Sequence, residues 1–136
     1  MKNNKGFTLV EMLVVIAIIG ILSATVLTAL GPSRNRAKDA RIISNLQQVR
    51  AIAETLYDGD YNAVNVGQAD IVRAAQDITD NQGTLTINVS ANGLSYAAYS
   101  NLATGGKWYC VDSVGAAKEL TSNPGVVTAC TAVAVP

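Results

Sequence analysis

The sequence contains no histidine and little charge. Its 136 residues hold ten Lys and Arg against ten Asp and Glu, so 15% of the chain is charged and the formal net charge is zero. Without histidine, a His-based catalytic triad, a His-ligated metal and an imidazole pH switch are all excluded. Apolar residues make up 49% of the chain, and most of this excess lies in one segment near the N-terminus.

Motifs for catalysis and for cofactors are also missing. We find no phosphate-binding glycine loop, no paired acid cluster and no spacing of a nucleophile and a base. Two cysteines without histidine do not make a zinc site. Asp58, Asp60 and Asn62 copy the start of an EF-hand loop, but Ala63 replaces its glycine and Ala69 replaces its closing glutamate. We therefore predict that the protein is not an enzyme and binds neither a metal nor a cofactor.

The long apolar segment runs from Phe7 to Leu30, and Glu11 is its one charged residue. As a helix it measures about 36 Å, which is enough to cross a hydrocarbon core of about 30 Å. Lys2 and Lys5 precede it, as in an export signal, and Ala29-Leu30-Gly31 resembles a signal cleavage site. The segment is too long for a removable signal and Pro32 fits poorly after the cut, so we favour a retained membrane helix.

Glu11 requires an explanation, because an ionised carboxylate inside a bilayer costs roughly 2.5–3.5 kcal/mol at the centre and less near the surface. No positive side chain lies within the segment. Two partners are open: water or a lipid headgroup reached by snorkelling, or an α-amino group created by cleavage just before Phe7. Such an amine would lie about one helical turn from Glu11.

The residues around this position carry a family resemblance. Lys5-Gly6-Phe7-Thr8-Leu9-Val10-Glu11 resembles the leader junction of type IV pilins and type II secretion pseudopilins, and the similarity continues to Leu22. The resemblance implies cleavage after Gly6, N-methylation of Phe7, and assembly in which Glu11 meets the Phe7 amine of a neighbouring subunit. The implied partners are a prepilin peptidase and methyltransferase, an inner-membrane assembly platform, membrane lipid before assembly, and other copies of the chain.

The resemblance also decides the expected topology. Lys2 and Lys5 mark the leader as cytoplasmic, but basic residues at the other end of the apolar segment compete with them under the positive-inside rule. From the resemblance we expect a single-pass cytoplasmic membrane protein with a cytoplasmic leader and an extracytoplasmic head. After assembly it would stand in a cell-surface or periplasmic filament.

The chain is therefore expected to have three parts: a leader at 1–6, a transmembrane and filament-core helix at 7–30, and a pilin head at 31–136. The head begins with an amphipathic helix at about 33–57, whose apolar stripe comprises Ile42, Leu46, Val49, Ala53 and Leu56, with Asn45 among the surface positions. If this helix continues the apolar one, Pro32 introduces a kink. The resemblance implies that Gly20, Gly31 and Pro32 are the positions where the stem bends.

The remaining pattern predicts a small antiparallel sheet. A short helix over 67–80 is followed by a hairpin over about 84–100, with Asn92-Gly93 as a type I′ turn. Counting outward from that turn pairs Val89 with Tyr96 and Ile87 with Ala98, and the apolar face should cover the helix stripe. Residues 107–112 and 126–130 read as further strands. The fold class is α+β and pilin-like, a long N-terminal helix packed on three to four strands.

Cys110 and Cys130 are the two cysteines of the chain. In an extracytoplasmic head they can form a disulfide, worth roughly 3 kcal/mol in the chain-entropy model. The pair, which bounds the segment 110–130, resembles the C-terminal disulfide-bounded region of type IV pilins, which favours a pilus subunit over a pseudopilin.

We therefore interpret the chain as a prepilin, the structural subunit of a type IV pilus-like filament. The alternative is a pseudopilin of a type II secretion or competence DNA-uptake system, and a third possibility is a monomeric membrane-anchored binding domain. Direct DNA binding has weaker support: residues 34–50 are basic, but no groove combining aromatic and basic residues can be assembled.

Overall fold

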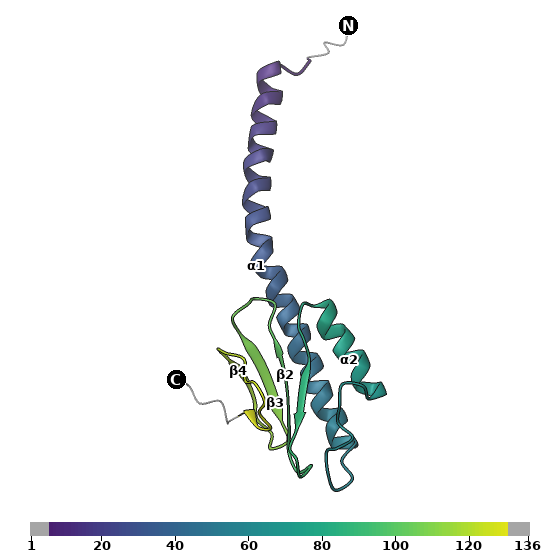
Figure 1. Ribbon diagram of the computed structural model, residues 1–136. Coiled ribbons are helices and arrows are strands. Elements are labelled where there is room, and N and C mark those ends of the chain that lie inside the picture. Colours follow the sequence, from purple (N-terminus) through teal and green to yellow (C-terminus); the bar gives the residue numbers. More distant parts are fainter. Residues whose placement is uncertain (1–5, 131–136) are drawn as a thin grey trace. The chain divides into compact units, whose positions relative to one another are not determined.

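The computed structural model describes residues 6–130 and has the expected α+β fold (Figure 1). Its elements are α1 (Leu9–Thr55), α2 (Ala69–Asp80), β1 (Thr86–Val89), β2 (Tyr96–Asn101), β3 (Trp108–Asp112) and β4 (Ala117–Leu120). The chain divides into two compact units, Met1–Arg34 and Asn35–Pro136, and α1 contributes residues to both. Apart from Gly6, the predicted leader lies outside the described residues.

In the first unit, α1 is helical through all three expected bend positions, Gly20, Gly31 and Pro32. A single proline removes one backbone hydrogen bond from the helix. Near that gap, the Ser33 hydroxyl donates to the Ala29 carbonyl at 3.3 Å. The two expected helices are thus one element, and the boundary predicted after Leu30 falls within it.

In the second unit, α1 buries the predicted apolar stripe. Ile42, Leu46, Val49 and Ala53 are fully buried, and Leu56 is half-buried. Asn45, predicted to lie on the surface, is instead 7% exposed. It borders a groove that α2 residues also line, and its amide donates to the Arg41 carbonyl at 3.0 Å. The prediction of an exposed Asn45 was wrong because it considered one helix alone, whereas α2 packs beside α1 at this position.

Helix α2 confirms the helix predicted over 67–80 and buries Ile71, Ala74 and Ile78. Gln68 caps its start by accepting hydrogen bonds from the backbone amides of the first turn. At its end, Gln82 has φ 70°, and the Gly83 amide donates to the Ile78 carbonyl at 2.9 Å, a Schellman motif. A Cβ on Gly83 would lie 2.6 Å from Ser100 Oγ, so glycine is required where this helix end meets β2.

The four strands form one antiparallel sheet in the order β1-β2-β3-β4. The predicted hairpin register is confirmed: Val89 pairs with Tyr96 and Ile87 with Ala98. The predicted type I′ turn is wrong, because Asn92 does not have the positive φ that this turn requires. The Gly93 amide instead donates to the Ser90 carbonyl at 2.9 Å, and of the two expected turn residues Gly93 alone has a positive φ. Both turns give the same pairing, so the register survives.

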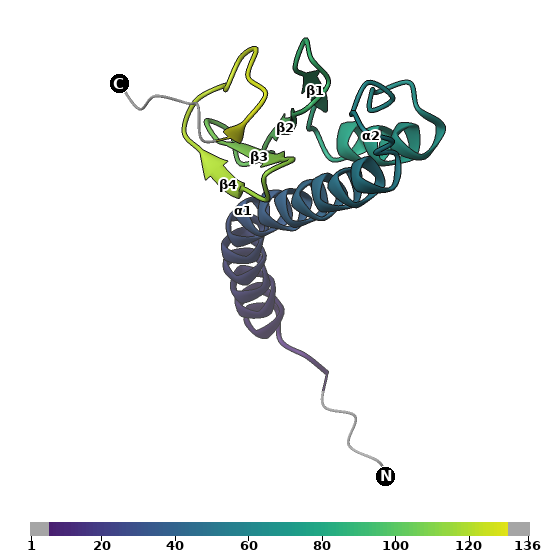
Figure 2. The same cartoon turned by 90° about the horizontal axis from the view of Figure 1, so that it is seen from below.

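The two faces of the sheet are covered by different parts of the chain. One face packs on α1 and α2, and its core includes Leu46, Val49, Ile78, Tyr96 and Val111. The predicted contact between the hairpin and the helix stripe is therefore confirmed. The other face packs under the C-terminal segment through Ala97, Tyr99 and Cys130. Figure 2 shows the sheet between the helices and this segment.

The last strand is not where the sequence predicts it. Residues 126–130 contain no strand, and β4 lies at Ala117–Leu120 instead. Gly115, with φ 92°, allows a tight turn after β3 that returns the chain at once beside it. The later segment crosses the outer face of the sheet, where the Gly125 carbonyl accepts from the Tyr99 hydroxyl at 2.6 Å and the Asn88 amide at 3.1 Å.

Candidate functional site

The expected cleavage site lies in an exposed segment that precedes the helix. Gly6 and Phe7 have no regular secondary structure, and α1 begins at Leu9. Phe7 is 75% exposed, and no described residue other than the chain neighbours of Gly6 has an atom within 4 Å of a Cβ built on Gly6. The peptide bond between them is therefore accessible to another protein.

Glu11 has a local partner that the sequence analysis missed. Its Oε2 accepts from the Thr8 amide at 2.8 Å and from the Thr8 hydroxyl at 2.6 Å. In return, the Glu11 backbone amide donates to the Thr8 hydroxyl oxygen at 3.3 Å. This is a capping box, in which Thr8 is the N-cap of α1. The spacing Thr-x-x-Glu before an apolar run was the signal that predicts it. Both Thr8 donors use Oε2, so Oε1 is open to a further donor.

The structure does not bring Phe7 and Glu11 together by a hydrogen bond or an ion pair. Among the described residues, Glu11 bonds only within the capping box. A cation for Glu11 must come from outside the described part of the chain or from another molecule.

The first unit exposes a long apolar surface. Leu9, Ile16, Ile21 and Leu27 are between 66% and 79% exposed, and none of the residues in the most apolar stretch of α1 is buried. Among the described residues, α1 is the one helix long and apolar enough to cross a membrane. An apolar surface of this size requires lipid or protein around it.

The head is closed by a disulfide between Cys110 and Cys130, whose Cα atoms are 5.7 Å apart. Beside it, the fully buried carboxylate of Asp112 accepts three backbone hydrogen bonds. Its Oδ1 accepts from Val114 at 3.1 Å and Ala116 at 2.8 Å, and its Oδ2 accepts from Cys130 at 2.8 Å. Asp112 thus joins the turn before β4 to the C-terminal segment.

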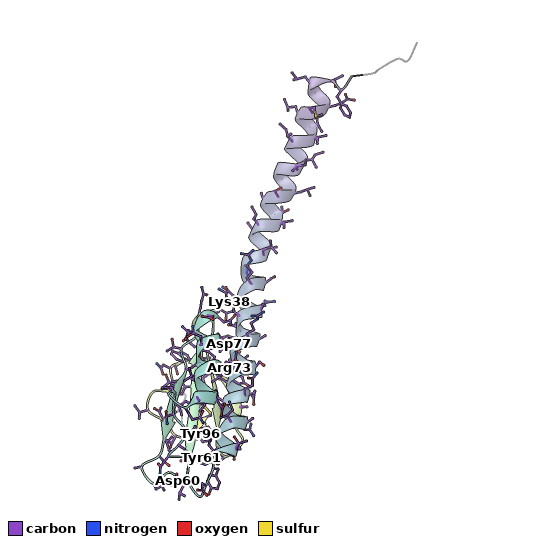
Figure 3. All side chains as sticks on the ribbon, turned by 90° about the vertical axis from the view of Figure 1, so that its right-hand side faces the viewer. Lys38, Asp60, Tyr61, Arg73, Asp77 and Tyr96 are labelled. Atoms are coloured by element: carbon purple, nitrogen blue, oxygen red, sulfur yellow. A yellow bond between two sulfur atoms is a disulfide. The ribbon has the colours of Figure 1, made fainter. Side chains whose placement is uncertain are left out.

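Tyrosine side chains pack together where α1 ends, and Figure 3 shows Tyr96 and Tyr61 there. Their rings lie 4.8 Å apart, edge to face. Burial, followed by the nearby Glu54 carboxylate, raises the pKa of both phenols above the ordinary value. The Tyr61 hydroxyl lies 3.2 Å from Glu54, whereas the Tyr96 hydroxyl has no hydrogen-bond partner among the described residues.

The described residues contain no group of three His, Cys, Asp or Glu side chains placed to hold a metal ion. In the segment that imitates an EF-hand, Asp60 instead accepts from the Asn62 backbone amide at 2.9 Å, which is a turn within the chain.

Comparison with known proteins identifies the family. Residues 1–27 match the model described as the prokaryotic N-terminal methylation motif. The type IV wide pilus major component PilA4 of Thermus thermophilus is 36% identical over 109 residues, which cover 80% of this chain and 82% of that protein. The chain belongs to the type IV pilin family. This pilin is also 28% identical over 142 residues to the type IV major fimbrial protein FimA of Dichelobacter nodosus, covering 83% of the chain and 91% of that protein.

Other relatives match a smaller share of the pilin. A fimbrial protein of Pseudomonas aeruginosa is 38% identical over 55 residues, 40% of this chain and 36% of that protein. No solved structure matches the chain. The protein is a structural subunit of the pilin type and not an enzyme, and its apolar helix makes it a membrane-anchored one.

Proposed function

We propose that this pilin is cleaved after Gly6, methylated on the Phe7 amine, and assembled through residues 7–30 into a type IV pilus. The observation that carries the proposal is a single carboxylate, Glu11, in the first turn of an apolar helix and four residues after an accessible Gly6-Phe7 bond. The relatives named above are components of pili and fimbriae, which favours a pilus over a secretion pseudopilus.

Cleavage creates the charge that Glu11 lacks. Hydrolysis adds water across the peptide bond, leaving a carboxylate on Gly6 and an amine on Phe7. The amine remains basic after methylation, so it is positively charged at neutral pH. Thr8 occupies only Oε2 of Glu11, which leaves Oε1 to accept from an ammonium group of another subunit. The capping box would thus orient the carboxylate and still leave one of its oxygens able to accept another hydrogen bond.

Pairing between subunits explains why an acid is tolerated in this position. Before assembly, Glu11 faces lipid with the capping box as its only partner, and its charge is costly at that depth. In the filament an amine from a neighbour at matching height removes that cost and sets the axial register of the two helices. The exposed apolar side chains around Glu11 can contact a neighbouring helix, but such contacts do not fix the axial register of the two helices.

We further propose that Gly20, Gly31 and Pro32 allow the stem to bend or unwind within the filament. The described residues offer no packing reason for the two glycines, since apart from the chain neighbours and the helix's own backbone none of their atoms lies within 4 Å of a Cβ placed on either. Glycine and proline both weaken a helix relative to other residues.

The proposed topology has the leader in the cytoplasm and the head outside it. The peptidase, the methyltransferase and the assembly platform would act at the inner membrane, where lipid surrounds α1 before assembly. A disulfide between Cys110 and Cys130 supports this placement, because disulfides persist in oxidising compartments outside the cytoplasm.

The direct test is the N-terminal mass of filaments sheared from cells. We expect the mass of a chain that begins at Phe7 and has one added methyl group, with the Cys110-Cys130 disulfide intact. A full-length chain that starts at Met1 and does not polymerise would contradict the proposal.

Replacement of Glu11 tests the pairing. We expect Glu11→Val to insert into the membrane normally and to lower the yield of sheared filaments at least about tenfold, because the neighbour's amine loses its partner. The matched control is Thr25→Val, another change from polar to apolar in the same segment, which should assemble as the unaltered pilin does. Filament yield and membrane content are measured by immunoblot. Equal filament yields for the two variants would refute the pairing.

A further inference from the structure

Basic and acidic residues are separated along α1 and the loop that follows it. The stretch 35–50 has four basic residues and one acid, whereas 51–72 has four acids and no base. We call Arg36, Lys38 and Arg41 the basic end, and Glu54, Asp58, Asp60 and Asp70 the acidic end. Figure 3 shows Lys38 near one end of the head and Asp60 at the other.

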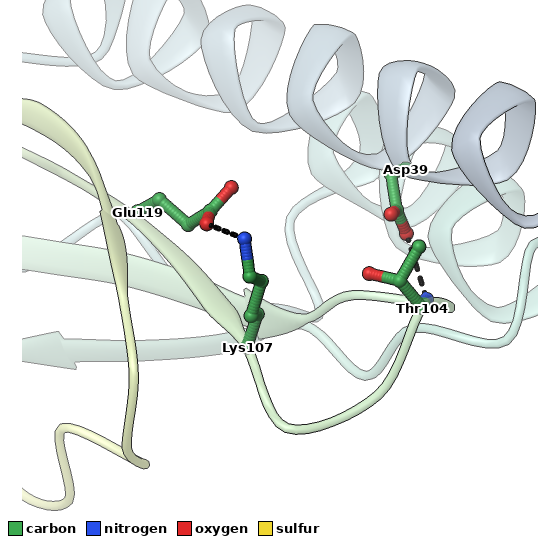
Figure 4. Close-up of polar contacts among 4 residues, drawn as sticks. All are labelled: Asp39, Thr104, Lys107 and Glu119. Carbon is green, nitrogen blue, oxygen red and sulfur yellow. Dashed lines mark hydrogen bonds and ion pairs between the residues drawn. The ribbon is translucent and has the colours of Figure 1, made fainter.

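Within the described residues these charges form no ion pair of 4.0 Å or less, although Arg50 lies one helical turn before Glu54 and Arg73 lies three positions after Asp70. The one salt bridge among the described residues joins Lys107 to Glu119, outside both ends (Figure 4). Asp39, the acid next to the basic end, accepts from the Thr104 backbone amide at 3.2 Å. At the acidic end, the hydrogen bonds that Glu54 and Asp60 accept from described residues come from neutral donors, the Tyr61 hydroxyl and the Asn62 backbone amide.

Arg41, a member of the basic end, has an acid across a groove. It borders the groove between α1 and α2 together with Asp77, but the two do not form an ion pair within 4.0 Å. Arg36 and Arg41 are exposed and Lys38 is half-buried, so their charged groups are available to another molecule.

The position of the acids is unfavourable for a single subunit. The C-terminal end of a helix carries a partial negative charge, which favours cations and disfavours anions. Helix α1 ends at Thr55 with no basic residue in its last turn, and Glu54 and Asp58 lie there instead. A cation from another molecule would compensate both the carboxylates and the helix end.

The spacing of the two ends suits a second copy of the chain. Arg36 and Glu54 are 18 positions apart, which is about five turns, so they lie on the same side of α1 about 27 Å apart. Ala40 and Ala51 are exposed between them, and their short side chains permit close approach. Two parallel subunits displaced by about this distance would bring the basic end of one to the acidic end of the other.

We propose that the basic end of one head contacts the acidic end of a second copy, and that this contact sets the axial spacing of the heads. The inference rests on the proposed function, because parallel displaced copies exist only in a filament. Charge complementarity of this kind selects the partner and its register more than it adds affinity. The contact should weaken in high salt, because the screening length is about 3 Å at 1 M.

Charge reversal in the full-length pilin tests the contact. One variant reverses the basic end with Arg36→Glu and Lys38→Glu, and another reverses the acidic end with Glu54→Lys and Asp58→Lys. A third variant combines all four changes, which restores opposite charges across the contact. The matched control is Lys107→Glu with Lys118→Glu, which reverses two cations outside both ends. Protection of Cys110 and Cys130 from thiol labelling reports that each head has folded.

We expect each reversal to lower the yield of sheared filaments about tenfold, because like charges then face each other. The combined variant should recover most of the yield, and the control should match the unaltered pilin. The inference is overturned if both reversals assemble normally, or if the combined variant folds but assembles no better than either reversal. Where a reversed head fails to fold, the neutral variant with Arg36→Gln and Lys38→Gln should still lower the yield, and unchanged assembly overturns the inference. Absence of filaments from the unaltered pilin would instead refute the proposed function.

Discussion

At the scale of single residues, a few side chains in this pilin satisfy local backbone requirements and leave one group free for another molecule. Thr8 and Glu11 are the clearest case, since the capping box uses one carboxylate oxygen and leaves the other open. The Gly83 position is the opposite case, because the nearby Ser100 and Ile78 leave no room for a Cβ. We propose that Thr8 and Glu11 serve assembly, whereas Gly83 serves the fold.

Gln82 is the non-glycine residue with a positive φ among the described residues, and it occupies the position after the α2 C-cap that usually holds glycine. We expect Gln82→Gly to raise the free energy of unfolding by about 0.5–1 kcal/mol, because it removes the steric cost of this conformation. Gln76→Gly, in the interior of α2, should instead lower it by about 1 kcal/mol. Denaturant titrations of the full chain in detergent, followed by fluorescence of Trp108, measure both. A loss of stability in Gln82→Gly would contradict the account of this turn.

At the scale of elements, the head is held by contacts between segments that are distant in the sequence. Helix α2 packs against one side of α1, and the C-terminal segment covers the outer face of the sheet. The disulfide ties that segment to β3, and the Asp112 carboxylate adds hydrogen bonds to the turn before β4 and to Cys130.

We expect Asp112→Asn to destabilise the head by about 1–3 kcal/mol, because an amide cannot accept hydrogen bonds at both of its terminal atoms. The buried Cys130 amide or the half-buried Ala116 amide would lose its acceptor. Asp80→Asn is the control, since Asp80 is exposed and its one side-chain contact is with Gln76. Thermal unfolding of the oxidised chain in detergent compares the variants. If both lose equally little stability, Asp112 does not hold the C-terminal segment.

At the scale of the whole molecule, the pilin is an apolar helix attached to a head that is closed by its own disulfide. The tyrosine cluster gives this head a dependence on alkaline pH. Burial and the Glu54 carboxylate raise the pKa of Tyr61 and Tyr96, so the folded head retains their protons at a pH where the unfolded chain has lost them. Stability from these groups is complete below pH 10 and falls as the pH rises above it.

We therefore expect the head to unfold progressively above about pH 10, and Tyr96→Phe to weaken this dependence. At neutral pH the same change should lower the stability little or raise it, because the Tyr96 hydroxyl is buried and has no hydrogen-bond partner in the described part of the chain. Tyr61→Phe is the comparison: it also removes a titrating phenol, but it loses the hydrogen bond to Glu54. Trp108 fluorescence against pH measures the transitions. An unfolding curve for Tyr96→Phe that follows the unaltered pilin at alkaline pH would show that Tyr96 does not contribute.

Features that depend on neighbouring residues were predictable from the sequence. The apolar segment, the stripe of α1 and the hairpin register all arise from periodic patterns, and each is seen in the structure. The pairing of Val89 with Tyr96 even survives a wrong turn type, because both turns place the strands in the same register. The capping box depends equally on neighbouring residues, and the Thr-x-x-Glu spacing was sufficient to predict it.

Taken alone, the sequence determined where the long apolar stretch lies, which residues resemble a pilin junction, and which face of the amphipathic part of α1 is apolar, because these depend on the spacing of side chains along one element. The tertiary structure alone decided that Asn45 is buried, that the last strand is β4, and that Asp112 joins Cys130. Each of these depends on which distant segment packs where. Which segments pack together depends on contacts throughout the head, so no single stretch of residues encodes the result.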